Sequence, residues 1–278
     1  TKAQKVYSVL PSDGSGDFAF ERNGKGTRVN KDSLIETIGT SVDDLARLDW
    51  LNSNCPSLLI EPLRTNRQVR SEEIDNASWS KINTTVTANQ TTAPTGELTA
   101  DKLSRTSTAA NYVSGLSSKS ASSQLDAVSS VFVKQGQGDF IAFRAQGSYP
   151  NRADAIFQFS TKTLTTSVAG SNFSVTSSQV QDYGNGWYRL SIVYNTDTSA
   201  TIQSILSPRA TSGQVDATDT STTAFAYVWG VQFEEGSTLS SYIETGSAAT
   251  TRLADVCSIT TPADVTTITE TFADNTTN

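Results

Sequence analysis

The side chains best suited to binding chemistry lie close together near the middle of the chain. Arg144, Tyr149, Asn151, Arg152 and Asp154 fall within one polar stretch, residues 144–154. Guanidinium, amide and carboxylate groups form directional hydrogen bonds with sugar hydroxyls, and an aromatic ring packs against the C–H face of a sugar. Loops on a rigid scaffold commonly carry such groups. The stretch is therefore predicted to be a glycan-binding loop between two strands; an ordinary solvated loop is the alternative.

Trp187 is a further candidate for ligand binding. It follows the turn Gly184-Asn185-Gly186, and in a strand its side chain shares a face with Arg189. An exposed ring at this place would stack on a ligand, whereas a ring packed against the sheet edge would have a structural role. The burial of the ring decides between these roles.

Catalysis has few routes in this chain. Histidine is absent from all 278 residues, which excludes Ser-His-Asp and Cys-His nucleophile pairs in their usual form. Paired carboxylates remain as a route to glycoside hydrolysis. Glu72 and Glu73, like Glu234 and Glu235, are sequence neighbours, and neighbours in a strand point to opposite faces. We therefore expect a protein that is not an enzyme.

Composition also limits the partners. The net charge of −7 and the 18% of charged residues argue against binding of nucleic acid or of an anionic membrane surface. No stretch approaches the roughly 20 apolar residues of a membrane helix, so no membrane insertion is expected. Two cysteines without histidine are too few for a zinc site. No cofactor is predicted, and a structural Ca²⁺ on carboxylates near the start of the main domain stays open.

Apolar and polar residues alternate along several short segments. The pattern is clearest at 153–160, 187–194 and 225–233, and in the last segment it places Tyr227 and Trp229 on the same face as Phe233. A period of two is typical of half-buried strands, and several such strands separated by Gly-rich turns indicate a sandwich. The predicted fold class is all-β: an antiparallel jelly-roll β-sandwich with a small β-rich N-terminal region and an extended C-terminal arm.

Three regions follow from the composition: a β-rich assembly region at 1–70, the jelly-roll domain at 71–247, and an extended Thr-rich segment at 248–278. The chain contains no methionine and starts without an apolar signal core, so we expect a piece of a longer product. The third region has too few large apolar residues to fold alone, which predicts order against a partner chain or disorder.

Local patterns subdivide the first region. A strand is expected at 6–10, and a hairpin is expected around the polar turn Lys31-Asp32-Ser33. The acidic start of 43–48 indicates a helical turn. Another strand is expected over 58–62 and ends at a proline.

Several short motifs occur together along nearly the whole chain. They include Gly26–Asn30 (GTRVN), Cys55–Pro62 (CPSLLIEP), Ala77–Trp79 (ASW), Ala100–Leu103 (ADKL), Gly184–Arg189 (GNGWYR), Val228–Gly236 (VWGVQFEEG), Ser241–Ile243 (SYI) and Ala254–Cys257 (ADVC). This set resembles a block found in bacteriophage virion proteins, especially tail fibres and other appendages. The resemblance implies a structural component of the virion, assembled in the host cytoplasm, that contacts other virion proteins and forms a homotrimer.

The main domain has a second resemblance, to the jelly-roll carbohydrate-binding modules of glycoside hydrolases. It rests on Trp79, on the segment Val131–Lys134 and on the closing strand with its carboxylates. Together the two resemblances imply a tail-fibre or host-recognition component that binds host-surface glycans. The alternatives are a carbohydrate-binding module of a secreted polysaccharide-degrading enzyme, and a capsid decoration or head-fibre protein.

Overall fold

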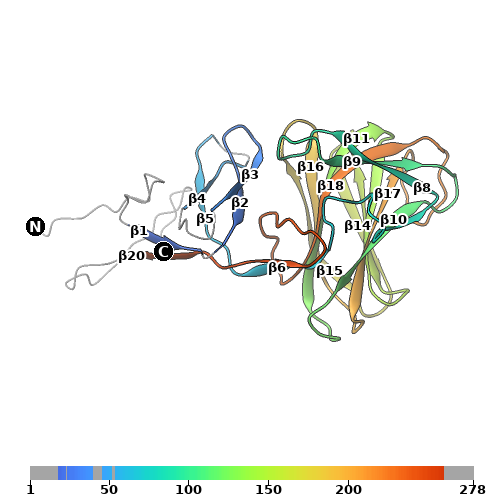
Figure 1. The fold of residues 1–278 in the computed structure, drawn as a ribbon. Helices are drawn as coiled ribbons and strands as arrows, with labels where there is room; N and C mark the ends of the chain where they lie inside the picture. The colour runs from blue at the N-terminus through green and yellow to red at the C-terminus, as the bar shows by residue number, and fades with distance from the viewer. Residues whose placement is uncertain (1–17, 23, 40–45, 52–53, 260–278) are drawn as a thin grey trace, which may run out of the picture.

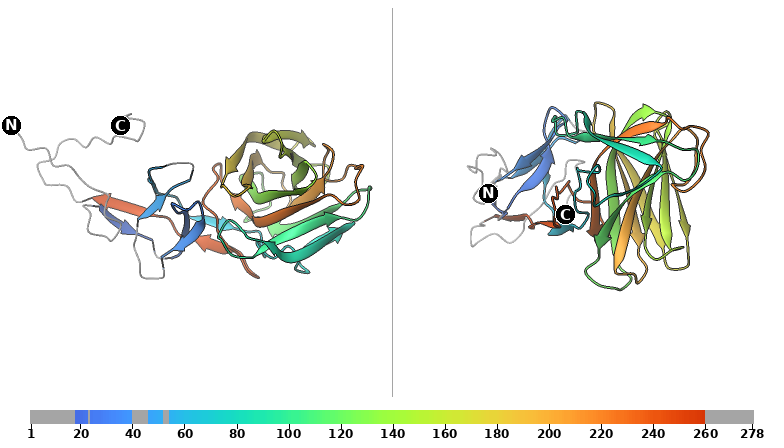
Figure 2. Two further views of the ribbon diagram at one scale, coloured as in Figure 1. Left: turned by 90° about the horizontal axis from the view of Figure 1, so that it is seen from above. Right: turned by 45° about the vertical axis from the view of Figure 1, so that its right-hand side comes forward.

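The computed structural model describes residues 18–22, 24–39, 46–51 and 54–259. These residues form strands and connecting turns and contain no helix, so no helix long and apolar enough to cross a membrane occurs among them. Two large antiparallel sheets face each other as a sandwich, and a narrower stem projects from one side (Figures 1 and 2). The predicted all-β sandwich is confirmed.

Each large sheet has six strands. The first sheet contains, in spatial order, β14 (Thr163–Ala169), β13 (Arg152–Gln158), β12 (Phe140–Gln146), β17 (Thr201–Arg209), β10 (Tyr112–Ser118) and β7 (Ser80–Ile82). The second sheet contains β15 (Ser174–Asp182), β16 (Trp187–Asn195), β11 (Asp126–Gln137), β18 (Phe225–Glu235), β9 (Ala100–Arg105) and β8 (Thr84–Thr91). Most neighbours in space are distant in sequence, so the sandwich depends on long-range pairing.

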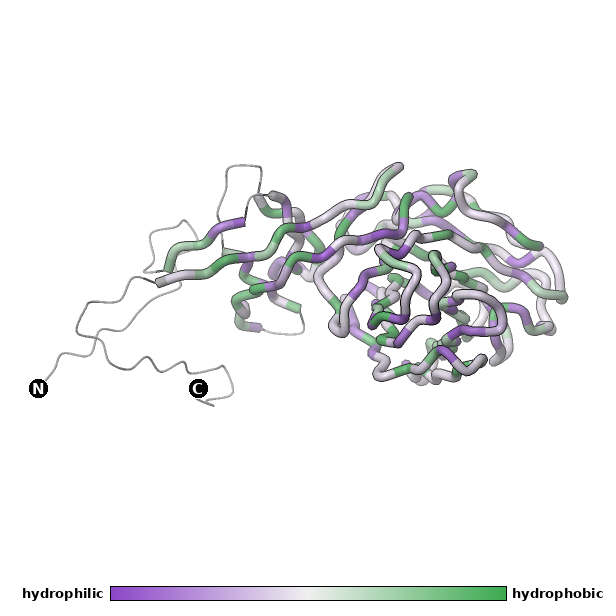
Figure 3. The backbone as a smooth tube through the Cα atoms, turned by 90° about the horizontal axis from the view of Figure 1, so that it is seen from below, coloured by the Kyte–Doolittle hydropathy of each residue, from purple (hydrophilic) through white to green (hydrophobic). Residues whose placement is uncertain are grey.

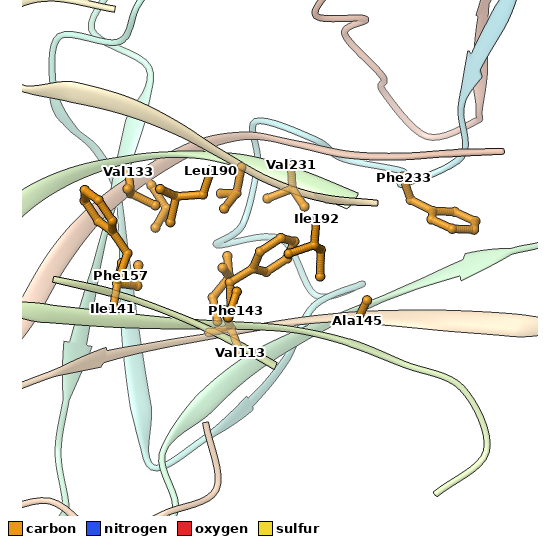
Figure 4. Close-up of a cluster of buried hydrophobic side chains, with 14 of the residues drawn as sticks. Val113, Val133, Ile141, Phe143, Ala145, Phe157, Leu190, Ile192, Val231 and Phe233 are labelled. Atoms are coloured by element: carbon orange, nitrogen blue, oxygen red, sulfur yellow. The ribbon is translucent and has the colours of Figure 1, made fainter. Parts of the chain in front are cut away.

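The main core lies between the two sheets. Phe143 and Phe157 come from the first sheet, Leu190 and Ile192 come from the second, and all four are fully buried (Figure 4). The predicted alternation at 153–160 and 187–194 is confirmed, because every second residue of each segment faces this core: Ala153, Ala155, Phe157 and Phe159 in the first, and Tyr188, Leu190, Ile192 and Tyr194 in the second. Burial of each such side chain contributes about 1.5–3 kcal/mol.

A β-bulge breaks the alternation in β18. Between the pairs Ser130–Gln232 and Phe132–Trp229, β18 contains one more residue than β11. Val231 therefore faces the main core, whereas Trp229 faces the other side of the sheet. The prediction that Tyr227, Trp229 and Phe233 share one face is wrong, since the extra residue at the bulge reverses the side-chain direction.

The stem consists of the described residues of 18–66 together with 250–259. It contains four two-stranded pairs: β1 (Phe18–Glu21) with β20 (Val256–Ile259), β6 (Arg64–Asn66) with β19 (Thr250–Arg252), β2 (Gly26–Val29) with β3 (Ile35–Ile38), and β4 (Arg47–Asp49) with β5 (Ser57–Leu59). The β1–β20 pair lies at the end of the stem away from the sandwich (Figure 1). Segments from the first and third predicted regions thus form one unit.

The local predictions for the stem have different outcomes. The hairpin around Lys31-Asp32-Ser33 is confirmed as β2–β3, and Ser33 adopts the positive φ of 61° that closes its turn. The helical turn at 43–48 is wrong for its described part, because Arg47–Asp49 is extended and pairs with β5. Tertiary pairing outweighs the local helical signal there. The strand expected at 6–10 lies outside the described residues.

An aromatic cluster joins the stem to the second sheet. Phe132 contacts Tyr183, Trp229 and Tyr242 with ring centroids 4.9, 5.3 and 5.9 Å apart. Val29, from β2 of the stem, belongs to the same buried cluster. The tube view shows hydrophobic residues in the stem as well as in the sandwich (Figure 3). The part of the second sheet's outer face that carries this cluster is therefore buried beneath the stem.

A buried ion cluster completes the stem. It consists of Arg22, Arg47, Glu61, Arg252 and Asp255, with Ser241 between Arg47, Glu61 and Arg252. Glu61 Oε2 lies 2.8 Å from Arg47 Nη1 and 2.7 Å from Arg252 Nη1. Arg47 also pairs with Asp255, and the Ser241 amide donates to Glu61 at 2.7 Å. Charges from β4, β19 and the segment before β20 are thereby held together.

Candidate functional site

The predicted binding loop is shorter than 144–154. Arg144 belongs to β12, Arg152 and Asp154 belong to β13, and only residues 147–151 connect the strands. The strand period places Arg144 and Asp154 on the outer face, opposite the core residue Phe143. The predicted loop therefore includes the ends of two strands, because the strands continue through polar positions.

Arg144 and Asp154 form the buried base of this outer face. Each is 2% exposed. Arg144 Nε lies 2.5 Å from Asp154 Oδ1, and the Arg144 Nη atoms lie 2.9 and 3.0 Å from the two oxygens of Asp216. Burial lowers the pKa of Arg144, but the bonds to Asp216 and Asp154 outweigh it and raise the pKa. The charged form is thereby held in one fixed geometry.

Asp216 connects the base to solvent. Its pKa is lowered, chiefly by its hydrogen bonds from Arg144, and 40% of its side chain is exposed. It lies in the connection between β17 and β18, far from 144–154 in sequence. Sequence reasoning missed Asp216, since nothing local marks the place where a loop folds over a sheet.

Tyr149 forms the exposed part of the face, and Arg152, whose side chain is 13% exposed, lies beside it. Tyr149 is 73% exposed, and the Arg152 guanidinium lies 5.5 Å from its ring centroid. Arg152 Nε also bonds Asp154 Oδ2 at 3.0 Å. Gln146 Nε2 donates to Gln203 Oε1 at 3.1 Å on the neighbouring strand. We call Tyr149, Arg152, Asp216, Gln146 and Gln203 the polar patch.

Asn151 lies apart from the polar patch. Its Nδ2 donates to Asp197 Oδ2 at 3.3 Å, and the same oxygen accepts the Ser148 amide at 2.8 Å. Burial raises the pKa of Asp197, but these bonds and those from Ser199 outweigh it, so the pKa is lowered. Asn151 therefore holds the 147–151 loop in place, and its amide is already engaged.

Trp187 does not fit a ligand-binding role. It is 2% exposed, packs in the aromatic cluster beneath the stem, and its Nε1 donates to the Thr92 carbonyl at 3.0 Å. Trp187 therefore has the structural role that the sequence left as the alternative, because the stem packs on the outer face of the second sheet. The sequence did not show that the stem folds back over this strand.

The described residues contain no candidate metal site, because no three Asp, Glu or Cys side chains among them are placed to hold an ion. The Ca²⁺ that the sequence left open is therefore assigned no ligands.

Comparison with known proteins gives little similarity. No family model matches the chain, and no curated protein sequence matches it. One similar solved structure contains the CBM22-1 and GH10 modules of the N-terminal endo-1,4-β-D-xylanase 10B of Clostridium thermocellum, in complex with xylohexaose. The two sequences are 16% identical, and the TM-score is 0.35. The match covers 66% of this chain and 30% of that chain. The chain thus spans less than a third of that protein, and a match at this score supports no argument about function.

Proposed function

We propose that this chain is a non-catalytic glycan-binding jelly roll that contacts its ligand through the polar patch. The observation that carries the proposal is the exposed Tyr149 ring beside Arg152 and Asp216, which rest on the buried Arg144–Asp154 pair. The ring offers a surface for sugar C–H groups, the guanidinium donates, and the carboxylate accepts from hydroxyls. A base of paired charges fixes these groups before the ligand arrives.

The double variant Tyr149→Ala, Arg152→Ala is expected to lose glycan binding at least tenfold on a panel of surface polysaccharides. Its melting temperature should stay within about 4 °C of the wild type, because Tyr149 is 73% exposed and Asp154 keeps its ion pair with Arg144 when Arg152 is removed. Binding is measured on immobilised glycans, and the bound polysaccharide should be recovered uncleaved.

Arg67→Ala is the matched control, since Arg67 forms a partly exposed ion pair with Glu235 away from the polar patch. It should bind as the wild type does. Equal binding by the double variant and the control would refute the proposal and place recognition elsewhere.

The proposed setting of this module is a homotrimeric virion appendage, such as a tail fibre, that contacts other virion proteins and host-surface glycans. The motif resemblance supports the virion. The stem supports the assembly, because it carries four of the nine exposed large apolar side chains among the described residues: Ile60, Leu63, Leu253 and Val256. Apolar groups of this kind gather where a second copy binds. Several copies would turn weak glycan contacts into avidity.

The variant Leu63→Glu, Leu253→Glu tests this assembly. It should be monomeric in light scattering at micromolar concentration, whereas the wild type should be trimeric, because buried carboxylates oppose association. Leu98→Glu, at a 61% exposed leucine of the sandwich, is the control and should stay trimeric. A monomeric wild type would contradict the proposal.

A further inference from the structure

A cavity of about 370 Å³ lies between the stem and the outer face of the second sheet. We call it the stem cleft. Strands β2, β4 and β5 contribute one wall, the segment 237–242 contributes another, and the floor comes from β15 and β16. Its size is within the range of pockets for small ligands. The stem cleft and the polar patch belong to different sheets, so the inference below does not depend on the proposed glycan site.

Two neighbouring polar side chains on the floor have unsatisfied atoms. Gln181 and Arg189 are direct cross-strand partners, so their side chains leave the sheet on the same face. Both line the cleft. Within the described part of the chain, Gln181 Oε1 and Arg189 Nε are buried and have no hydrogen-bond partner. One is an acceptor and the other is a donor with a positive charge.

Arg189 is held rigidly but lacks a counter-charge. It is 1% exposed, its Nη1 donates to the Ser240 carbonyl at 2.8 Å, and its Nη2 donates to Ser130 Oγ at 3.1 Å. Its guanidinium lies 5.1 Å from the Phe132 ring centroid. Among the described residues it forms no ion pair. A buried cation without a carboxylate is costly, and an anion at Nε would relieve that cost.

The carboxylates of the cleft already have partners. Asp49 accepts the backbone amides of Val29 and Leu51, one on each oxygen, at 2.7 and 3.1 Å. Glu61 is paired with two arginines in the ion cluster. The cationic donor of Arg189 and the amide acceptor of Gln181 are therefore the buried atoms of the cleft that a ligand would satisfy. Hydroxyl and amide side chains of Ser177, Gln179 and Ser191 lie on the same floor. Tyr183, whose hydroxyl interacts with the Arg189 side chain, and Val193 line the cleft beside them and add ring and aliphatic surface.

We propose that the stem cleft binds a single sugar-acid unit. Its carboxylate accepts from Arg189 Nε, and a hydroxyl on the same ring donates to Gln181 Oε1. A charge-assisted bond to a buried guanidinium is stronger than a bond to a neutral group, so the carboxylate is preferred to a hydroxyl. The side chains of Tyr183 and Val193 contact the apolar face of the ring.

The variant Gln181→Glu tests the proposal, because its new carboxylate would face Arg189 and take the place of the ligand. Glucuronate, galacturonate and glucose are titrated into the full chain by NMR. The wild type should bind at least one of the two acids at millimolar concentration, and at least tenfold more tightly than glucose. Gln181→Glu should weaken acid binding at least tenfold and raise the melting temperature.

Two further variants separate this site from other effects. Gln181→Met removes the acceptor without adding charge and should weaken acid binding severalfold. The Tyr149→Ala, Arg152→Ala variant should bind the acids as the wild type does, whatever its effect on polysaccharides. The proposal is wrong if neither acid binds the wild type, if glucose binds equally well, or if Gln181→Glu binds the acids unchanged.

Discussion

Replacement of Glu61 by Gln is expected to lower the free energy of unfolding by about 3–5 kcal/mol. Gln retains the shape of the side chain but removes the charge that faces Arg47 and Arg252. Both guanidinium groups are buried, with exposed fractions of 1% and 2%. Arg47 keeps Asp255, whereas Arg252 loses its ion partner. The measurement is urea unfolding followed by tryptophan fluorescence.

Glu36→Gln is the matched control for this substitution. The Arg28–Glu36 pair is also in the stem, but its side chains are 24% and 36% exposed. Exposed ion pairs contribute about 0–1 kcal/mol, so this variant should unfold close to the wild type. If both variants lose the same free energy of unfolding, burial of the ion cluster does not add to the stability that its ion pairs provide.

The dependence on pH gives the Glu61 prediction a second readout. Burial raises the pKa of Glu61, but Arg252 and the bonds from Ser241 outweigh burial and hold the pKa below 4.5. A carboxyl whose folded pKa is lowered adds stability above its unfolded pKa, and this stability is lost as the pH falls through the folded value. The difference between wild type and Glu61→Gln should therefore narrow below about pH 4.5. A difference that stays constant down to pH 3 would contradict the role of the charge.

The sandwich can be predicted from the sequence because each strand shows its own alternation of apolar and polar residues. The alternation around Phe157 and Leu190 needs only one buried face per strand, and the structure places both residues in the main core. The partners of Arg144 show the limit. Asp154 is near in sequence, but Asp216 reaches Arg144 through a loop whose path depends on the whole sheet.

The same limit explains Trp187. The local pattern placed this ring on an outer face, and it does lie there, but the stem folds back over that face. Whether an outer face meets solvent or another element depends on long-range pairing such as β6 with β19. Periodicity gives the direction of a side chain within its strand, and it contains no information about what covers the sheet.

Gly230 is where periodicity itself fails. It has a φ of 62°, in the left-handed region, and it lies at the bulge that turns Trp229 and Val231 to opposite faces. A strict alternation cannot include the extra residue. The glycine was the available signal, since a glycine inside a strand often marks a bulge or a close backbone approach.

Replacement of Gly230 by Val is expected to destabilise the fold by about 2–5 kcal/mol. A β-branched residue in the left-handed region costs about 1–2 kcal/mol. A Cβ at this place would lie 2.9 Å from Phe132 Cδ2 and 3.1 Å from Tyr242 Cε2, and overpacking of such a site adds about 1–3 kcal/mol. Both rings belong to the aromatic cluster that joins the stem to the second sheet. The loss should therefore appear in urea unfolding and also as weaker near-UV circular dichroism of the native state.

Gly186→Val separates the backbone cost from the contact cost. Gly186 also has a positive φ, of 80°, but the nearest atom to its Cβ would be Lys134 Cε at 3.6 Å, which is ordinary contact. The control should lose only the backbone part, about 1–2 kcal/mol. If Gly230→Val loses no more than Gly186→Val, the packing of Phe132 and Tyr242 tolerates the added methyl groups. The bulge would then need glycine for its backbone conformation alone, and the close approach of the two rings would have no energetic weight.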